Sequence, residues 1–393
     1  MENVLIIGAY RSPSGRLLGK LSTLAAPALS AIVIKEALKR CDIRPAHVDE
    51  VIMGNVIAAG IGQNPARQAA ILARLPNTVA AFTVNKVCAS GMKAVALGAQ
   101  AIMLGEAEIV VAGGMESMSN APFLLTEMRS GKRYGDSTAI DSMILDGLMD
   151  CYNHTHMGTL CELTVKKYNI TRREQDEFAF RSHKKAMEAT KKGLFSDEII
   201  PVRVQKDGGE LIVDQDETIR WDTNIERLSR LKPVFKEDGT ITAGNSPGLN
   251  DGAAVLILSS ERAAKKLRLK PLAKIMGYSS AHLDPKWYTL APVKSVKGLL
   301  KKTGLKIEDF DLIEENEAFS AQTLAVMKEL SIDPAKVNVN GGAIALGHPI
   351  GASGARVLVT LIHALKKRNK ELGLATLCLG GGGAMSMAVR VFK

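Results

Sequence analysis

The chain has 393 residues, of which 46% are apolar and 23% are charged, so it holds enough apolar material for more than one hydrophobic core. This composition excludes a disordered chain and a fibrous repeat. The apolar runs at residues 4–9 and 109–112 are far shorter than the roughly 20 residues that cross a membrane, so we predict no membrane contact.

The excess of positive charge does not by itself indicate a partner. The formal net charge is +10, but many lysines stand in helical stretches whose charged faces contact solvent. Aromatic residues make up only 4% of the chain, which leaves few side chains to stack on bases. We therefore predict no nucleic-acid partner, while a small ligand that carries several phosphates is compatible with the charge.

The cysteines favour a reducing compartment. None of the five forms a C-x-x-C pair or a cluster with histidine, so we predict neither a metal site nor a disulfide framework. The first ten residues, MENVLIIGAY, read as a buried strand rather than as a basic leader with a cleavage site. Both observations predict a cytoplasmic protein.

Apolar runs typical of strands alternate with longer helical patterns through the first third of the chain. In chain order they predict a strand at residues 4–9, a helix at 24–40, a strand at 48–57, a helix at 65–75 and a strand at 108–114. This alternation predicts an α/β fold in which helices are layered on a sheet.

Two landmarks of the first third recur in the last third. The run DEVIMGN ends at Asn55, and the run DLIEEN ends at Asn316, 261 positions later. The turn and helix start around Cys88 and those around His348 are 260 positions apart. The two separations are nearly equal, which predicts an internal duplication of a βα unit, although two unrelated coincidences would give the same pattern.

A region of different character separates the two repeats. Residues 120–250 contain charged helical stretches, and the chain has seven methionines from Met115 to Met187 inclusive, which suits an irregular binding surface as well as a core. A Gly/Asn/Pro loop then leads into an apolar strand. The predicted domains are an N-terminal core half at 1–119 plus 250–270, an inserted ligand-binding domain at 120–249, and a C-terminal core half at 271–393.

Three residues stand in surroundings that suit catalysis. Cys88 precedes a helical pattern, and free N–H groups at a helix start lower a thiol pKa that begins near roughly 8.5. Cys378 ends a strand just before a run of four glycines, where backbone can approach a ligand. His348 lies in a Gly-rich turn, from which an imidazole can accept a thiol proton. A buried structural role stays open for each of them.

Two further polar residues end the strand that closes the second landmark. Asn316 and Glu317 are candidates for orienting a water molecule or a histidine, with ordinary helix capping as the alternative. The sequence contains no G-x-S-x-G, phosphate-loop, G-x-G-x-x-G or H-E-x-x-H motif in a supporting context, so the enzyme classes that depend on them lack their signatures.

Five motifs, taken together, resemble those of the thiolase family, and specifically of its acetyl-CoA acetyltransferases. They are NKVCASGMKA at 85–94, AGGMESM at 112–118, NEAF at 316–319, GGAIALGHPIGASGAR at 341–356 and CLGGGGAM at 378–385. The resemblance spans the whole chain. It implies two duplicated βαβαβαββ core halves, stacked in five layers αβαβα, with an inserted loop domain.

The resemblance also implies roles for individual residues. Cys88 is expected to take an acyl group from acyl-CoA, and His348 to act as the base that activates it. Cys378 is expected to remove a proton from the second acetyl-CoA, or to protonate the departing acetyl-CoA in the reverse reaction. Asn316 would hold a water that forms one oxyanion hole with His348, and the N–H groups of Cys88 and Gly380 would form the other.

By the same resemblance the inserted region binds CoA, with the guanidinium of Arg220 at the nucleotide end. Two pairs depart from the pattern of some members: Ser246-Pro247 stand in place of Ala-Ser, and Trp287-Tyr288 in place of a smaller or aliphatic pair. The residues expected to line the CoA groove are Leu148, His156, Met157, Arg220, Phe235, Ala243, Ser246, Ala318 and Phe319.

We therefore expect an acetyl-CoA C-acetyltransferase that needs no cofactor and no metal, because acyl-CoA and CoA are its substrates. The resemblance further implies a homodimer or a homotetramer. Two alternatives are a 3-ketoacyl-CoA thiolase of fatty-acid β-oxidation that prefers longer chains, and a catalytically silent CoA-binding paralogue. A silent paralogue would be expected to lack Cys88, His348 or Cys378, and all three are present.

Overall fold

One large sheet runs through both repeats of the chain. The computed structural model describes residues 3–206 and 209–392, and within them ten strands pair in the order β14-β15-β16-β13-β1-β12-β5-β3-β4, with β2 beside β12. The strands of the first half are β1 (Val4–Arg11), β2 (Gly15–Arg16), β3 (Glu50–Gly54), β4 (Ala80–Val84), β5 (Ile109–Ser117) and β12 (Asn250–Ser260). Those of the second half are β13 (Ala273–His282), β14 (Leu312–Glu315), β15 (Leu372–Leu379) and β16 (Gly383–Val391).

The two halves of the sheet share one strand order and meet at β1 and β13. Outward from this seam, β1-β12-β5-β3 in the first half corresponds to β13-β16-β15-β14 in the second. The seam is antiparallel, with Leu5 opposite Lys274 and Ile6 opposite Ala273. The outer pairs β3-β5 and β14-β15 are parallel. The predicted α/β class and the predicted duplication are therefore confirmed.

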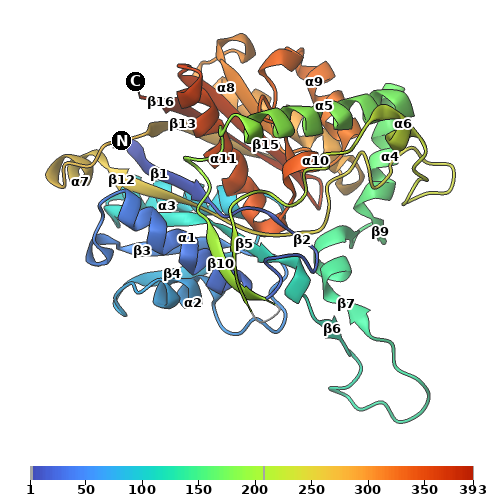
Figure 1. The fold of residues 1–393 in the computed structure, drawn as a ribbon, viewed down its shortest axis with the longest axis horizontal. Coiled ribbons are helices and arrows are strands. Elements are labelled where there is room, and N and C mark those ends of the chain that lie inside the picture. Colours follow the sequence, from blue (N-terminus) through green and yellow to red (C-terminus); the bar gives the residue numbers. More distant parts are fainter. Residues whose placement is uncertain (1–2, 207–208, 393) are drawn as a thin grey trace.

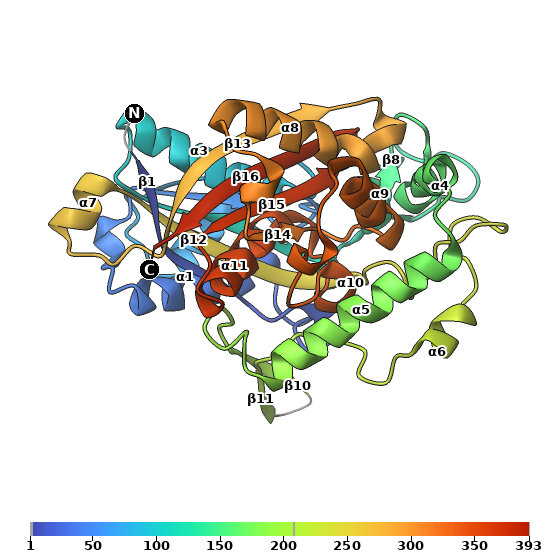
Figure 2. The same cartoon turned by 90° about the horizontal axis from the view of Figure 1, so that it is seen from above.

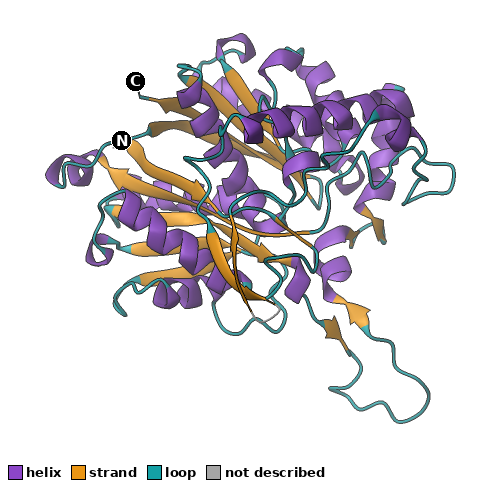
Figure 3. Cartoon of the chain, in the orientation of Figure 1, coloured by secondary structure: helices purple, strands orange, loops and turns teal. Residues whose placement is uncertain are grey.

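Helices cover both outer faces and fill the space between the two halves (Figures 1, 2 and 3). α1 (Ala26–Arg40) and α2 (Pro65–Leu72) lie on the first half, and α8 (Ala291–Thr303) and α9 (Ser320–Leu330) lie on the second. In the middle, α3 (Ser90–Leu104) and α11 (Ile350–Lys367) pack against each other, and α11 contacts strands of both halves. This arrangement is the layering αβαβα that the motifs imply.

The two central helices approach closely because each places a glycine against the backbone of the other. A Cβ atom on Gly91 would lie 2.8 Å from the amide nitrogen of Ala355, and one on Gly354 would lie 2.5 Å from that of Met92. The window Val87–Leu104 is long and apolar enough to cross a membrane by composition alone, yet 61% of it is buried inside the protein. The apolar character of this window is therefore that of a helix buried in the protein core.

The segment between β5 and β12 lies outside this sheet. Its helices α4 and α5 pack against α9, and α5 also contacts α10 (Figure 2). The β6-β7 pair leads into a loop that projects from the body (Figure 1). Its elements are η2 (Met118–Asn120), β6 (Phe123–Leu124), β7 (Ile140–Asp141), η3 (Ile144–Leu148), β8 (Met149–Asp150), β9 (Thr155–His156), α4 (Met157–Tyr168), α5 (Arg172–Lys191), β10 (Val202–Lys206), β11 (Gly209–Val213) and α6 (Ile225–Ser229).

Short elements complete the two halves and their connections. They are η1 (Pro45–His47), α7 (Glu261–Lys266), η4 (Pro285–Leu290), η5 (Ile307–Asp309), η6 (Pro334–Lys336) and α10 (Ala343–Leu346). Of these, α10 and the turn after it lead directly into α11, and η4 lies against α4, α8 and α9. The second half is therefore tied to the inserted region on both sides of the sheet.

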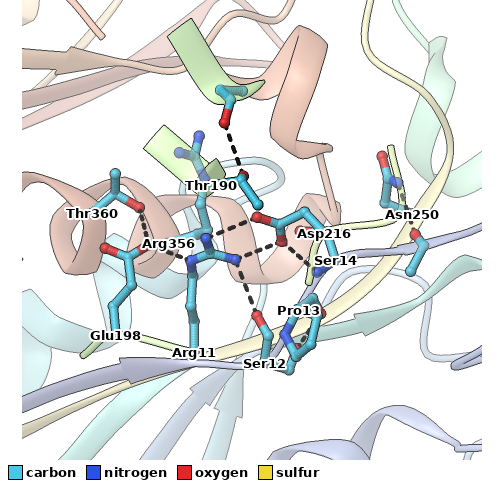
Figure 4. A network of polar contacts seen from close by, with 12 residues as sticks. Arg11, Ser12, Pro13, Ser14, Thr190, Glu198, Asp216, Asn250, Arg356 and Thr360 are labelled. Atoms are coloured by element: carbon cyan, nitrogen blue, oxygen red, sulfur yellow. Dashed lines mark hydrogen bonds and ion pairs between the residues drawn. The ribbon is translucent and has the colours of Figure 1, made fainter. Parts of the chain in front are cut away.

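A buried ion-pair network joins the inserted region to the core (Figure 4). The guanidinium of Arg11, on β1, donates to both carboxylate oxygens of Asp216 at 2.7 and 2.9 Å and to Glu198 Oε1 at 2.6 Å. Thr360 of α11 donates to the same Glu198 oxygen at 3.1 Å. The side chains of Arg11, Glu198 and Asp216 are at most 1% exposed. Removing the cation would leave two buried carboxylates without a countercharge.

We expect Arg11→Gln to lower the free energy of unfolding by about 3–5 kcal/mol, because it breaks a buried pair from one side. Urea unfolding followed by circular dichroism measures this loss. The matched control is Arg203→Gln, which breaks the exposed pair with Glu210 and is expected to cost less than about 1 kcal/mol. Equal losses of unfolding free energy in Arg11→Gln and Arg203→Gln would show that the buried network stabilises the fold no more than an exposed ion pair does.

Candidate active site

The turn between β4 and α3 presents Cys88. The helix begins at Ser90, two residues after the cysteine, and Val87 has a φ of +47°, which a β-branched residue rarely adopts. The hydroxyl of Ser90 donates to the carbonyl of Val87 at 2.6 Å and accepts from the N–H of Lys86 at 2.8 Å. This hydrogen-bonded turn, which is strained at Val87, thus fixes Cys88 between the sheet and α3.

The Cys88 thiol is neutral in the resting protein. Burial raises its pKa to about 12, and the N–H groups of Gly380 and of Cys88 itself, which bond the sulfur, lower it only in part. The expected depression of this pKa by the helix start is wrong, because desolvation outweighs the helix and Cys88 precedes the first helical turn. Cys88 therefore needs a base at the moment of attack.

His348 is placed to be that base. Its ring Nδ1 lies 2.6 Å from Ser353 Oγ, and this hydroxyl donates to the carbonyl of Pro349 at 2.8 Å. Because the serine hydrogen is committed to Pro349, Nδ1 carries the imidazole proton and Nε2 is left as an acceptor. Burial lowers the pKa of His348 to about 3, so the ring is neutral at physiological pH.

Cys378 is the second-last residue of β15, and Asn316 directly follows the neighbouring parallel strand β14. Cys378 is 1% exposed, and burial raises its pKa well above the ordinary value. The side chain of Asn316 is fully buried, and neither its Oδ1 nor its Nδ2 has a hydrogen-bond partner among the described residues. A buried amide without partners fits a water-binding role.

The neighbouring Glu317 has a different task. Its carboxylate accepts hydrogen bonds from Ser182 at 2.8 Å, from Asn338 at 2.9 Å and from the N–H of Ile344 at 3.1 Å, so it fastens α5 and α10 to the end of β14. Neither Asn316 nor Glu317 caps α9, whose N-cap is Phe319. Glu317 instead caps α10 (Ala343–Leu346), because its carboxylate accepts from the N–H of Ile344 in the first turn of that helix, so the capping alternative holds for Glu317 and not for Asn316.

Residues from both halves and from the inserted region line one cavity of about 450 Å³. Cys88, His348, Cys378 and Gly380 lie on its wall, while Asn316 is not among the lining residues. All nine residues expected to bind CoA line the same cavity, together with residues that the sequence did not indicate. The latter are Val87, Met118, Met143, Ile144, Gly147, Val234, Gly248, Leu249 and Ile350, while Pro247 and Tyr288, which belong to the two pairs noted in the sequence, also line the cavity.

Aromatic side chains form one wall of this cavity. The rings of His156 and Phe235 are stacked with centroids 4.4 Å apart, and Phe319 meets Phe235 edge-on at 5.9 Å. His156 Nδ1 accepts from the N–H of Gly158, and burial lowers the pKa of this histidine, so its ring is uncharged. The hydroxyl of Ser246 donates to the carbonyl of Thr242 at 2.6 Å, which leaves it only as an acceptor toward a ligand.

A second hollow of about 660 Å³ adjoins the first and shares Arg220, Gly248 and Leu249 with it. Arg16 and Arg220 bring two cations to its wall, and Trp221 is 49% exposed there. The guanidinium of Arg220 donates to the carbonyl of Ala243 at 2.8 Å, which fixes it at the boundary between the two hollows. Asp222 adds one carboxylate to the same wall, so the apolar cavity adjoins a charged basin in which cations outnumber anions.

Three positioning residues escaped the sequence prediction. Ser353 sets the tautomer of the His348 ring. The Oδ1 atom of Asn250 accepts a hydrogen bond from the backbone N–H of His348 at 2.8 Å. Glu116 accepts from Asn55 Nδ2 at 2.6 Å and from the N–H of Gly351 at 2.8 Å, so it anchors the first turn of α11 to the end of β3. Ser353 and Glu116 lie inside the quoted motifs, but only the structure reveals what they contact.

We expect His348→Ala to slow the alkylation of Cys88 by iodoacetamide at pH 7 by about 100-fold, the lower end of the range for a lost general base. Mass spectrometry of the labelled peptide follows the rate at Cys88 alone. His47→Ala changes a histidine of η1, outside the cavity, and serves as the control. Equal alkylation rates in the His348 variant and the parent would refute its role as the base.

Comparison with known proteins shows the family to which the chain belongs. The family model "Thiolase, N-terminal domain" matches residues 4–262, and "Thiolase, C-terminal domain" matches residues 269–391. An acetyl-CoA acetyltransferase of Cupriavidus necator is 52% identical over 99% of both chains, and a probable acetyl-CoA acyltransferase of Staphylococcus aureus is 49% identical over 100% of both. The crystal structure of the Bacillus anthracis acetyl-CoA acetyltransferase superposes with a TM-score of 0.98 at 45% identity, covering 100% of this chain and 99% of that one. This protein therefore belongs to the thiolase family.

Proposed function

We propose that this protein is an acetyl-CoA C-acetyltransferase, which joins two acetyl-CoA molecules into acetoacetyl-CoA and CoA and also catalyses the reverse reaction. The observation that carries this proposal is the meeting of two thiols and one neutral imidazole, Cys88, Cys378 and His348, on the wall of a single cavity. The acetyl-CoA acetyltransferases to which the chain is similar support the same conclusion.

The first half-reaction moves an acetyl group to Cys88. His348 Nε2 takes the thiol proton as the sulfur attacks the thioester carbonyl, and the N–H groups of Cys88 and Gly380, which already point at that sulfur, stabilise the oxyanion. The bond between the carbonyl carbon and the CoA sulfur then breaks. Cys378 gives its proton to the departing CoA sulfur and becomes a thiolate.

The second half-reaction forms the new carbon–carbon bond. The Cys378 thiolate removes a proton from the methyl group of a second acetyl-CoA, and His348 with the water expected at Asn316 stabilises the enolate oxygen. The enolate carbon attacks the acetyl group, the bond to the Cys88 sulfur breaks, and His348 returns its proton to Cys88. Every group regains its starting proton, so we propose that the reaction requires neither a redox cofactor nor a metal.

The two hollows suit the two ends of CoA. The pantetheine arm is uncharged and slender, so we place it along the apolar cavity that His156, Phe235 and Phe319 line. The nucleotide end carries phosphates, so we place it in the basin that holds Arg16 and Arg220. The thioester then lies at the inner end, next to Cys88.

A thiolysis assay across chain length tests the proposal. We expect the protein to cleave acetoacetyl-CoA with CoA, with a kcat/KM at least about tenfold above that for 3-ketohexadecanoyl-CoA. A preference for the long chain would instead identify a 3-ketoacyl-CoA thiolase of β-oxidation. No cleavage of either substrate by folded protein would identify a silent CoA-binding paralogue.

We also propose a homo-oligomer that acts in the cytoplasm. The projecting segment exposes Phe123, Leu125 and Met128, whose apolar surfaces favour burial against another copy of the chain. The edge strand β4 supports this, since none of its five residues is fully buried and one side of its backbone has no strand partner within the described residues. Light scattering distinguishes a dimer from a tetramer.

A further inference from the structure

One buried carboxyl group beside the proposed active site has no part in the steps above. Glu315 is the last residue of β14, its side chain is fully buried, and Asn316 follows it directly. Carboxyl groups are almost never buried without a specific partner, because desolvation is costly. Its surroundings therefore define what it does.

The sheet places Glu315 on the same face as Cys378. Glu315 lies opposite Thr376 in the parallel pair of β14 and β15, and Cys378 stands two positions after Thr376, so it points to the same side. Gln322, in the first turn of α9, donates to Glu315 Oε1 and covers this face. The preceding Glu314 points to the opposite face, as alternation along a strand requires.

The second carboxyl oxygen of Glu315 is unused. Oε2 has no hydrogen-bond partner in the part of the chain that the structure describes. Burial and the charge of Glu317 raise the pKa of Glu315 well above its ordinary value, and the bond from Gln322 only partly offsets this. Burial thus favours the protonated carboxyl group, and since Oε1 accepts from Gln322, a proton carried on Oε2 would be an unpaired donor.

Cys378 lies among groups that oppose its ionisation. Burial is the largest cause of its raised pKa, and Cys88, Glu315 and Cys161 raise it further where they are ionised. Cys161 comes from α4, and Tyr288 of η4 packs in the same cluster. The hydroxyl of Tyr288 is not free to stabilise a thiolate, because it donates to the carbonyl of Met157 at 2.9 Å. An ionised Glu315 would also raise the pKa of Cys378, whereas a neutral one offers an O–H donor.

We propose that Glu315 is a positioning residue for Cys378: its carboxyl O–H donates, through one water molecule, a hydrogen bond that stabilises the Cys378 thiolate. The proposal rests on the proton-transfer role of Cys378 given above. It assigns Glu315 no proton transfer of its own, since Cys378 loses its proton to the departing CoA sulfur and regains it from the acetyl methyl group.

Two variants of Glu315, which are expected to give different rates of Cys378 alkylation, test the proposal. Glu315→Gln keeps the size of the side chain and an N–H donor, while Glu315→Leu keeps only the size. In a Cys88→Ala background, the pH dependence of iodoacetamide alkylation at Cys378 reports the thiolate fraction without turnover. Glu308→Gln, which changes an exposed carboxylate of η5 outside the cavity, is the control and is expected to match the background.

We expect Glu315→Leu to slow alkylation of Cys378 at pH 8 by about tenfold or more, and to shift its pH profile upward, because the thiolate loses a hydrogen bond. Glu315→Gln should stay within about threefold of the background, since an amide N–H replaces the O–H. With Cys88 intact, both variants should still acquire an acetyl group on that residue, which shows that they are folded.

Two results would overturn the proposal. Unchanged alkylation in Glu315→Leu would show that Glu315 does not act on Cys378, and faster alkylation in Glu315→Gln would show that the native carboxyl is ionised and destabilises the thiolate. Failure of the proposed function is distinguishable from these results, because it appears as absent thiolysis in the parent protein while the alkylation profiles still depend on Glu315.

Discussion

Cys88→Ala should abolish formation of the acetyl-enzyme and lower kcat for thiolysis of acetoacetyl-CoA by roughly 10⁴-fold or more, as is typical for loss of a nucleophile. The reason is geometric. The oxyanion donors, the N–H groups of Cys88 and Gly380, converge on the Cys88 sulfur, and no other thiol occupies that position in the described cavity. Intact-mass spectrometry after incubation with acetyl-CoA detects the added acetyl group in the parent and its absence in the variant.

A matched cysteine variant separates loss of chemistry from loss of folding. Cys41 follows α1 on the outer side of the first half, where burial raises the pKa of its thiol to about 11, and it does not line the cavity. Cys41→Ala should therefore keep parental acetylation and turnover. Normal turnover in Cys88→Ala, with that control also active, would refute the assignment of the nucleophile.

Cys378→Ser should divide the reaction into its two halves. Serine preserves the size of the side chain but is a far weaker acid, so it cannot supply the base that removes the methyl proton. We expect Cys88 still to acquire an acetyl group from acetyl-CoA, because CoA can leave as a thiolate without the proton that Cys378 gives it, while kcat for condensation falls by about 10²–10⁴-fold. Quenched-flow labelling with acetyl-CoA measures the first step, and formation of acetoacetyl-CoA measures the second.

The location of the label decides between the two cysteines. Peptide mapping of acetylated Cys378→Ser should place the acetyl group on Cys88. In the parent protein, a label recovered on Cys378 would reverse the two assignments, because the nucleophile is the residue that carries the covalent intermediate. Unimpaired condensation in Cys378→Ser would show that another group removes the methyl proton.

Much of the fold was predictable because periodicity and repetition are local properties of the sequence. The matching strand ends at Asn55 and Asn316 predicted the duplication, and the structure places them at equivalent ends of β3 and β14. Helix ends were less predictable. The helix expected at 65–75 ends at Leu72, because Ala73 closes it and Arg74 adopts a φ of +67°. Such boundaries depend on tertiary contacts that a single sequence does not display.

The candidate site was predictable in its residue types but not in its electrostatics. The motifs indicated Cys88, His348 and Cys378, and the structure brings all three to one cavity. The sequence predicted a depressed pKa for Cys88 from its position before a helix, whereas burial raises that pKa. Burial follows from packing between distant segments. For the same reason the sequence did not reveal that Ser353 sets the His348 tautomer.

The internal symmetry has a consequence for the origin of this chemistry. Cys88 and His348 stand two residues before α3 and α11, at corresponding places in the two repeats. A precursor assembled from two identical chains would have carried the same amino acid at both places. A thiol on one side and an imidazole on the other became possible only when the two copies were joined and mutated separately, so fusion allowed the division of labour between attacking group and proton acceptor.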